Sequence, residues 1–406
     1  MLRQWFSSLL TFALILLILA VLVSAASAKP KFKILQRISG GLFSGLTVDA
    51  KGHLYGATSA GGDHGGGSVF ELTRNAKGQW NLTTLHSFNG PDGASPNGGL
   101  IFDPAGNLYG TTHGGGAFAR GTAFELTPGS AGWAFTDVYD FCPEYPYNCD
   151  DGETPNAGLV MDSAGILYGS AGGGRCHGFG VAFEFLPGSG GWQEKILFNW
   201  GCRDYDATAS NAPLTLDQAG NLYGTSFYGG LNHEGTVFEL KRGASNWKER
   251  LLRSFDGSDG LGPYAGVIFD LFGNLYGTTN QGGSSRCGET TCGTVFKLTP
   301  THNGHWKETV LYDFPNPTDG NFPGGGVVFD KEGNLYGATV AGGIGGCSGG
   351  CGVIYKLSPV VKGRWKCTVL HKFNGNDGGQ PMGALILDQK GDLYGTAYNV
   401  VYEITP

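Results

Sequence analysis

The amino-acid sequence predicts an all-β fold, namely a seven-bladed β-propeller with four antiparallel strands in each blade. A phrase close to Gly-Asn-Leu-Tyr-Gly-Thr-Thr occurs seven times in the 406 residues. The tyrosines of these phrases lie 53 to 60 residues apart, at positions 55, 109, 168, 223, 276, 336 and 394. A repeat period of this length is typical of propellers, solenoids and arrays. The chain also ends part-way through the seventh repeat, which suits a closed ring better than a linear array.

Each repeat contains four short runs with a β pattern. In the second repeat these runs are Gly98–Asp103, Asn107–Thr112, Gly121–Thr127 and Trp133–Phe141. Short runs that are rich in Val, Ile, Tyr, Phe and Thr and bounded by turn residues indicate strands. No long segment of the repeat shows a helical period. Four antiparallel strands with short connections make one propeller blade.

The two ends of the chain are expected to close the ring. The seventh repeat stops after its third strand, Asn399–Thr405, and the N-terminal run Lys31–Ile38 aligns with the outer strand Cys367–Phe373 of the sixth repeat. We therefore expect Lys31–Ile38 to form the outer strand of the last blade. A ring that is closed in this way leaves only short sheet edges open.

The repeated phrase itself is explained by structure rather than by catalysis. Asp-x-x-Gly before the second strand, as in Asp103 and Gly106, fits a type I turn followed by a left-handed Gly. Leu and Tyr alternate, so they face the two neighbouring blades. The Gly after Tyr leaves room for an aromatic ring such as Phe124, Phe238 or an outer-strand Trp. The outer-strand tryptophans are Trp80, Trp133, Trp192, Trp247, Trp306 and Trp365.

Residues 1–28 have the pattern of a secretory signal peptide, and residues 29–406 form the single propeller domain. Arg3 is the only charged residue before Lys29, the run Leu9–Val23 is apolar, and the segment ends in small residues up to Ala28. An uncleaved anchor helix is the alternative. Cleavage predicts a secreted, extracellular monomer with no membrane contact.

The composition argues against a nucleic-acid partner. The net charge is −7 and charged residues make up 15% of the chain, with no basic run. The 73 glycines do not indicate disorder, because aromatic residues make up 12% of the chain. Glycine is instead expected at many tight turns.

The nine cysteines predict disulfides, as is usual for exported proteins. Three local pairs are expected to be bonded, and Cys176 with Cys202 is a fourth candidate, which leaves Cys367 without an assigned role. Zinc is disfavoured for the local pairs because no second ligand pair is correctly spaced in the same repeat. We expect neither a metal nor a cofactor. The local pairs are Cys142–Cys149, Cys287–Cys292 and Cys347–Cys351.

The complete repeat resembles the GloVer tandem repeat of exported bacterial proteins. The resemblance lies in the ordered pattern D-x-x-G-N-L-Y-G-T-T, G-T-V-F-E-L, W, L-x-x-F and D-G-x-x-P, and it covers nearly the whole of residues 29–406. Members of that family often carry a C-terminal surface anchor. This sequence shows none, which favours simple secretion. The resemblance implies no established reaction.

Two kinds of loop are expected on one face of the propeller. One kind is Gly-rich and joins the second and third strands, and the other carries Asp-Gly before Pro and leads to the next blade. The acids of the second kind, Asp92, Asp151, Asp259, Asp319 and Asp377 with Asp206 in a divergent copy, are interpreted mainly as turn-forming rather than calcium-binding. The histidines of the first kind, His64, His113, His177 and His233, are interpreted as exposed loop residues rather than metal ligands.

The binding site is expected where the repeats differ most. Two enlarged connections on this face, Cys142–Pro155 and Asn199–Pro213, follow the second and third repeats. Their aromatic and charged side chains suit a sugar or a peptide, although the inserts could merely cover the rim. The candidate residues are Tyr145, Tyr147, Asp151, Trp200, Arg203, Asp204, Tyr205 and Asp206.

Three classes of function remain open. The first is a secreted or cell-surface binding or scaffold module for an extracellular glycan or protein. The second is a polysaccharide hydrolase or lyase, for which Asp204 with Asp206 or Asp151 is the carboxylate grouping to test. The third is a purely structural surface protein. No motif of a serine hydrolase, a zinc protease or a P-loop enzyme is present, so the sequence favours binding or structure over catalysis.

Overall fold

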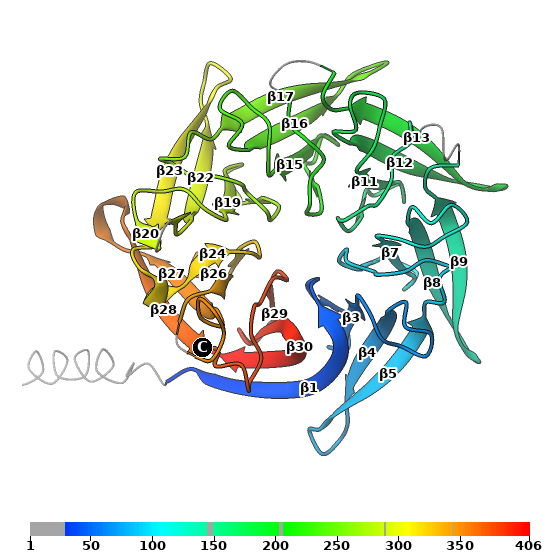
Figure 1. Ribbon diagram of the computed structural model, residues 1–406, viewed down its shortest axis with the longest axis horizontal. Helices are drawn as coiled ribbons and strands as arrows, with labels where there is room; N and C mark the ends of the chain where they lie inside the picture. Colours follow the sequence, from blue (N-terminus) through cyan, green and yellow to red (C-terminus); the bar gives the residue numbers. More distant parts are fainter. Residues whose placement is uncertain (1–28, 144–148, 203–205, 288–289, 344) are drawn as a thin grey trace, which may run out of the picture.

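The computed structural model describes residues 29–143, 149–202, 206–287, 290–343 and 345–406, and it confirms the seven-bladed propeller. The proposed signal peptide lies outside these residues. Seven sheets surround a central axis, and each has a short inner strand and a long outer strand (Figure 1). Apart from two 3-10 turns, η1 (Pro317–Asp319) and η2 (Val361–Gly363), no helix occurs in the described part of the chain, and none there could cross a membrane.

Each of the first six blades takes its strands in chain order from the axis outward. Blade 1 contains β2 (Thr47–Val48), β3 (Leu54–Thr58), β4 (Ser68–Arg74) and β5 (Trp80–Ser87); blade 2 contains β6 (Ile101–Phe102), β7 (Leu108–Thr112), β8 (Thr122–Gly129) and β9 (Gly132–Asp140); blade 3 contains β10 (Val160–Met161), β11 (Leu167–Ala171), β12 (Val181–Gly188) and β13 (Gly191–Asn199). Blade 4 contains β14 (Thr215–Leu216), β15 (Leu222–Ser226), β16 (Thr236–Arg242) and β17 (Trp247–Ser254); blade 5 contains β18 (Ile268–Phe269), β19 (Leu275–Thr279), β22 (Thr294–Pro300) and β23 (Trp306–Asp313).

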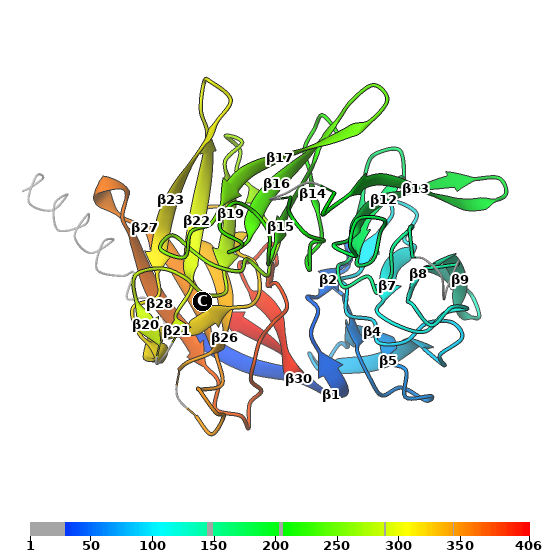
Figure 2. The same cartoon turned by 45° about the horizontal axis from the view of Figure 1, so that its top comes forward.

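The last two blades add smaller variations. Blade 6 contains β25 (Val328–Phe329), β26 (Leu335–Ala341), β27 (Val353–Pro359) and β28 (Trp365–Lys372), and β24 (Asn321–Pro323) pairs with β26. Blade 7 contains β29 (Ile386–Leu387), β30 (Leu393–Thr405) and β1 (Lys31–Leu42). A small extra hairpin, β20 (Arg286–Cys287) and β21 (Thr290–Thr291), lies in the Gly-rich loop of blade 5. Figure 2 shows the hairpins between third and fourth strands, such as β22–β23, projecting from the ring.

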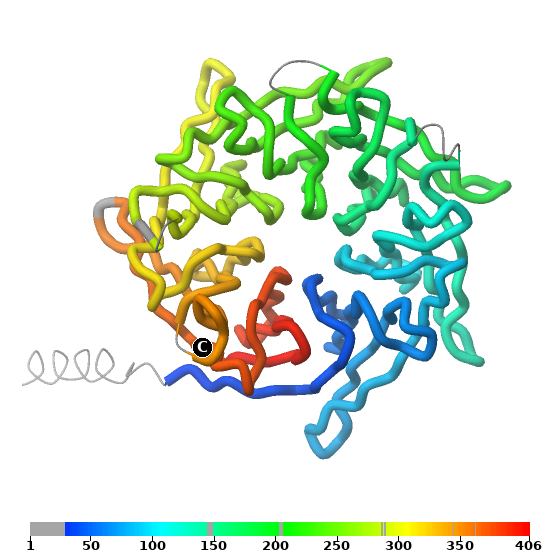
Figure 3. Tube along the Cα trace, in the orientation of Figure 1, coloured from blue at the N-terminus to red at the C-terminus, as the bar shows by residue number. Residues whose placement is uncertain are grey.

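The predicted ring closure is confirmed. β1 pairs antiparallel with β30, from Lys31 opposite Thr405 to Arg37 opposite Val400, and the strand continues four residues beyond the predicted end, Ile38, to Leu42. Figure 3 shows the first and last segments of the chain side by side at the rim. Side chains of β1 pack in both directions, with Phe32 in the blade 6–7 core and Leu35 in the blade 7–1 core. This strand therefore joins both ends of the ring.

The turn predicted for the repeated phrase is also confirmed. Gly106 has a φ of 91°, and its N–H donates to the Asp103 carbonyl at 3.1 Å. The Asp103 carboxylate accepts the Asn107 N–H at 2.8 Å, which holds the turn in place. At the other end of the phrase, the Tyr109 hydroxyl donates to Glu125 on the third strand at 3.0 Å.

The glycine after tyrosine lies under an aromatic ring in every blade, as expected. A Cβ on Gly110 would lie 2.6 Å from Phe124, and one on Gly224 would lie 2.5 Å from Phe238. Non-bonded carbon atoms prefer about 3.5–4.0 Å, so only glycine leaves room for the ring. The third strand, rather than an outer-strand Trp, supplies the ring in each blade. The seven rings are Phe70, Phe124, Phe183, Phe238, Phe296, Tyr355 and Tyr402.

The hydroxyl that follows this glycine joins neighbouring blades near the axis. Thr111 Oγ1 of blade 2 donates to the Ala157 carbonyl of blade 3 at 2.8 Å. Ser170, Thr225, Thr278 and Thr396 make a similar contact, each to a backbone carbonyl in the segment that leads into the next inner strand. Blades 1 and 6 have alanine at this position. The phrase thus sets the turn, the packing within the blade and the spacing between blades.

Candidate functional site

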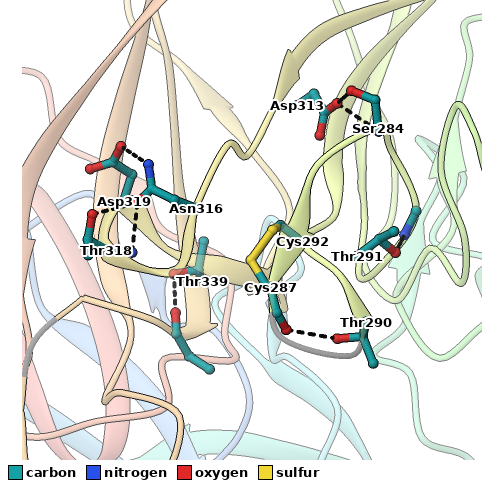
Figure 4. Close-up of a disulfide and its surroundings, with 12 residues drawn as sticks. Ser284, Cys287, Thr290, Thr291, Cys292, Asp313, Asn316, Thr318, Asp319 and Thr339 are labelled. Carbon is teal, nitrogen blue, oxygen red and sulfur yellow. Dashed lines mark hydrogen bonds between the residues drawn. A yellow bond between two sulfur atoms is a disulfide. The ribbon is translucent and has the colours of Figure 1, made fainter.

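The two predicted kinds of loop do share one face, which we call the loop face. Backbone bridges join the connection that enters a blade to the Gly-rich loop of that blade, as in Ala94 with Gly114 and Ala207 with Gly229. Figure 4 shows both kinds of loop at blades 5 and 6, where the Cys287–Cys292 disulfide of the blade 5 Gly-rich loop lies beside the connection to blade 6 that contains Asn316 and Asp319.

All four predicted disulfides are present, and all lie in loops of this face. Three are local, and the fourth, Cys176–Cys202, ties the Gly-rich loop of blade 3 to the connection that follows this blade. Cys367 is a free, half-buried thiol on β28, and burial raises its pKa to about 11. This cysteine therefore packs as a neutral thiol at physiological pH. Among the described residues, no group of three or more His, Cys, Asp and Glu side chains could hold a metal ion.

Most of the candidate residues on the two inserts cannot be placed. Tyr145, Tyr147, Arg203, Asp204 and Tyr205 lie outside the described residues. Their role in binding therefore stays a prediction. The three described candidates, Asp151, Trp200 and Asp206, interact with other groups of the protein.

The expectation that Trp200 offers an exposed aromatic face is wrong. Its side chain is 0% exposed, and its ring packs against Phe238 of blade 4 at a centroid distance of 5.3 Å. The indole N–H donates to Glu249 Oε1 on β17 at 2.9 Å. The ring fills the blade 3–4 interface because a buried carboxylate is available for its polar atom.

Asp151 and Asp206 lie beside partly buried carboxyl groups of the next blade, Glu194 and Glu249. Asp151 accepts hydrogen bonds from the Tyr139 hydroxyl at 2.7 Å and from the Cys142 N–H at 3.0 Å. Burial, and then the charge of Asp151, raise the pKa of Glu194 to about 8. Burial, and then the charge of Asp206, raise the pKa of Glu249 to about 7. These acids therefore form part of the contacts between blades.

The other loop acids behave as turn formers, as interpreted from the sequence. Asp92 accepts the Asn89 N–H at 2.8 Å, and Asp377 accepts the Asn374 N–H at 2.9 Å. Asp259 accepts the Asp256 N–H at 3.0 Å and pairs with Arg253. Each carboxylate thus holds its own turn and also pairs with a side chain of the preceding outer strand, namely His86, Arg253 or His371.

The described residues form a concavity on the loop face at the mouth of the central channel. It has a volume of about 560 Å³ and is lined by residues at the start of the inner strand of all seven blades. This volume is typical of small-molecule sites. The described lining contains no charged side chain.

One position in each blade gives this mouth its chemistry. It is the residue directly before the small-residue pair that starts the inner strand, and in blade order it is Phe43, Asn97, Asn156, Asn211, Tyr264, Gly324 and Met382. Three amides on consecutive blades therefore face an apolar arc that includes two aromatic rings. Phe43 and Tyr264 are 40% and 41% exposed. Asn97 Oδ1 is buried, and no described group donates a hydrogen bond to it.

A second cavity, of about 570 Å³, lies between blades 1 and 2 on the opposite face. Its polar side chains already bind one another. His53 Nδ1 lies 3.2 Å from Asp49 and 3.0 Å from Glu71, and the Tyr55 hydroxyl donates to Glu71 at 2.8 Å. The channel mouth is the better candidate because its amides have more unused capacity for hydrogen bonds.

The closed ring and its mouth define a propeller built from tandem repeats. The chain belongs to the Gloeobacter/Verrucomicrobia repeat family, whose sequence model matches residues 27–215 and 193–403. This confirms the resemblance of the repeat to the GloVer tandem repeat. No curated protein matched the sequence.

Solved structures share the architecture at low sequence identity. A streptogramin B lyase structure is 13% identical, with 93% of this chain and 97% of that chain covered and a TM-score of 0.55. A fungal alcohol oxidase of the AA5 family, in complex with copper, is 13% identical, with 93% and 76% covered and a TM-score of 0.54. An ancestral GH74 enzyme is 10% identical, with 91% and 51% covered and a TM-score of 0.59. At these identities the likeness shows the fold alone.

The ring of residues at the channel mouth was not predicted from the sequence. The repeats nevertheless contain a sequence signal for it. When they are aligned, the residue before the small-residue pair varies among Asn, an aromatic residue, Gly and Met. Its meaning depends on ring closure, which brings seven residues that are distant in the chain around one axis.

Proposed function

We propose that the protein is an exported binding module that recognises an uncharged glycan at the mouth of its central channel. The observation that carries this proposal is the uncharged cavity, with amides on one side and aromatic rings on the other. Amides donate and accept hydrogen bonds with sugar hydroxyls. Aromatic rings offer flat apolar surface to the C–H face of a sugar.

Two features support export. The N-terminal residues 1–28 have the pattern of a signal peptide, and four disulfides suit an oxidising compartment. Binding without hydrolysis is favoured because the described lining of the mouth contains no carboxylate, whereas a glycosidase requires a pair of them.

The test is a binding screen of residues 29–406 against arrays of neutral and charged glycans. We expect hits among neutral glycans, with affinities that change little between low and high salt because no ion pair forms. Asn97→Ala and Asn156→Ala should each lower the affinity about tenfold or more. Asn89→Ala, an exposed amide on the loop face away from the mouth, is the matched control. Binding only to charged glycans, or to none, would refute the proposal.

A further inference from the structure

Blade 4 differs from the other blades at one place on the loop face. Directly after its second strand it carries Phe227 and Tyr228, where blade 1 has Ser59 and Ala60, and blade 5 has Asn280 and Gln281. No other blade has two aromatic residues there. Tyr228 is 64% exposed. Such an exposed aromatic at the start of a Gly-rich loop has no role in the core of the blade.

These two rings continue the aromatic side of the channel mouth. Phe227 lies 4.8 Å from Tyr228 and 6.3 Å from Tyr264, measured between ring centroids. Tyr264 lines the mouth itself. The three rings therefore form a short aromatic track, which we define as Tyr264, Phe227 and Tyr228, leading from the cavity outward over blade 4.

The track is held in position from below. Phe227 packs against Gly262, which has a φ of 59°, and a Cβ on Gly262 would lie 2.8 Å from the ring. A glycine that places an aromatic ring in this way restricts how far the ring can move. Tyr228, although mostly exposed, therefore packs against a ring, Phe227, whose position is restricted.

The shape of the mouth limits which part of a ligand can enter. All seven blades contribute to its wall, so it is enclosed around the whole circumference. A linear polymer can place a chain end or a pendant group in such a cavity, whereas an internal segment can only cross the opening. The residues that follow an inserted end have to leave along the loop face.

From these observations we infer that the protein recognises the end of an uncharged polysaccharide chain, with the terminal sugar in the channel mouth and the following sugars on the aromatic track. This inference rests on the proposed function and specifies its ligand. The amides of Asn97, Asn156 and Asn211 hold the terminal sugar. Tyr264 and Tyr228 stack on successive sugars, which makes affinity depend on chain length.

The test uses ladders of neutral linear oligosaccharides, two to six residues long, from β-1,4-glucan, β-1,4-xylan, β-1,4-mannan and α-1,4-glucan. Calorimetric titration of residues 29–406 should show affinity rising with length. Tyr228→Ala should lower the affinity for the six-residue sugar about tenfold and leave the two-residue affinity unchanged. Asn97→Ala should lower both. Phe272→Ala is the matched control, because Phe272 is an aromatic residue that is 87% exposed on the opposite face.

A second measurement addresses the chain end directly. The intact polysaccharide and its partial hydrolysate are compared at equal mass as competitors for the six-residue sugar. End recognition predicts that the hydrolysate competes better in proportion to its larger number of chains. Equal competition by the polysaccharide and its hydrolysate would overturn this inference and leave glycan binding intact. So would an equal loss of affinity for the two-residue and six-residue sugars in Tyr228→Ala. No binding to any ladder would overturn the proposed function together with the inference.

Discussion

Replacement of Gly224 by alanine tests the packing of the repeated phrase. The added Cβ lies 2.5 Å from Phe238 Cζ and 2.8 Å from Leu214 Cδ2, whereas carbon contacts prefer about 3.5–4.0 Å, so the ring has to move by about 1 Å. Phe238 is fully buried and packs against Trp200 at 5.3 Å. Overpacking costs about 1–3 kcal/mol, and we expect the upper half of this range because neither neighbour has free space.

The assay is urea-induced unfolding of residues 29–406, followed by tryptophan fluorescence. Gly190→Ala is the matched control, since its Cβ meets no atom within 4 Å and its φ is not left-handed. The control should change the free energy of unfolding by less than about 0.5 kcal/mol. Phe238→Leu removes the ring and should relieve the overlap. The double variant Gly224→Ala with Phe238→Leu should therefore lose less free energy of unfolding than the two single variants together. A Gly224→Ala variant as stable as the control would refute this account of the phrase.

Three further predictions concern a buried acid, the closure of the ring and the disulfides. The folded-state pKa of Glu194 is raised to about 8, so the folded protein holds a proton that the unfolded chain releases at lower pH. The free energy of unfolding should therefore fall as the pH rises from about 5 to about 8. Glu194→Gln should flatten this fall in urea unfolding, and an unchanged profile would contradict the assignment of the fall to Glu194. Deletion of Lys31–Ile38 exposes the β30 edge and should give oligomers by size-exclusion chromatography with light scattering, whereas a stable monomer would argue against ring closure by β1. Non-reducing mass spectrometry of the secreted protein should find the four disulfides, and fewer than two would contradict their structural role.

Repetition explains why so much of the fold was predictable. Seven copies of one phrase reveal the blade number, and the incomplete last copy reveals the role of β1. Gly110 and Phe124 illustrate this point, because a glycine after the tyrosine and an aromatic residue on the following strand segment recur in every blade. A single copy would not separate this packing rule from chance.

The site was less predictable because it depends on contacts between repeats. Trp200 belongs to an insert that looks exposed in sequence, yet its partner Glu249 lies 49 residues further along the chain on the next blade. The set of residues around the channel mouth likewise depends on contacts between repeats that are distant in the sequence. Asn97 and Tyr264 lie in different repeats, and only the closed ring places them around one cavity.

The most direct test of the central claim is a crystal structure of residues 29–406 with a saturating neutral oligosaccharide taken from the binding screen. The account predicts a sugar ring in the channel mouth, with a hydroxyl within hydrogen-bonding distance of the side-chain amide of Asn156 or Asn211 and a face against Tyr264. A ligand bound only to the inserts or to the opposite face, with the mouth empty at saturation, would contradict it.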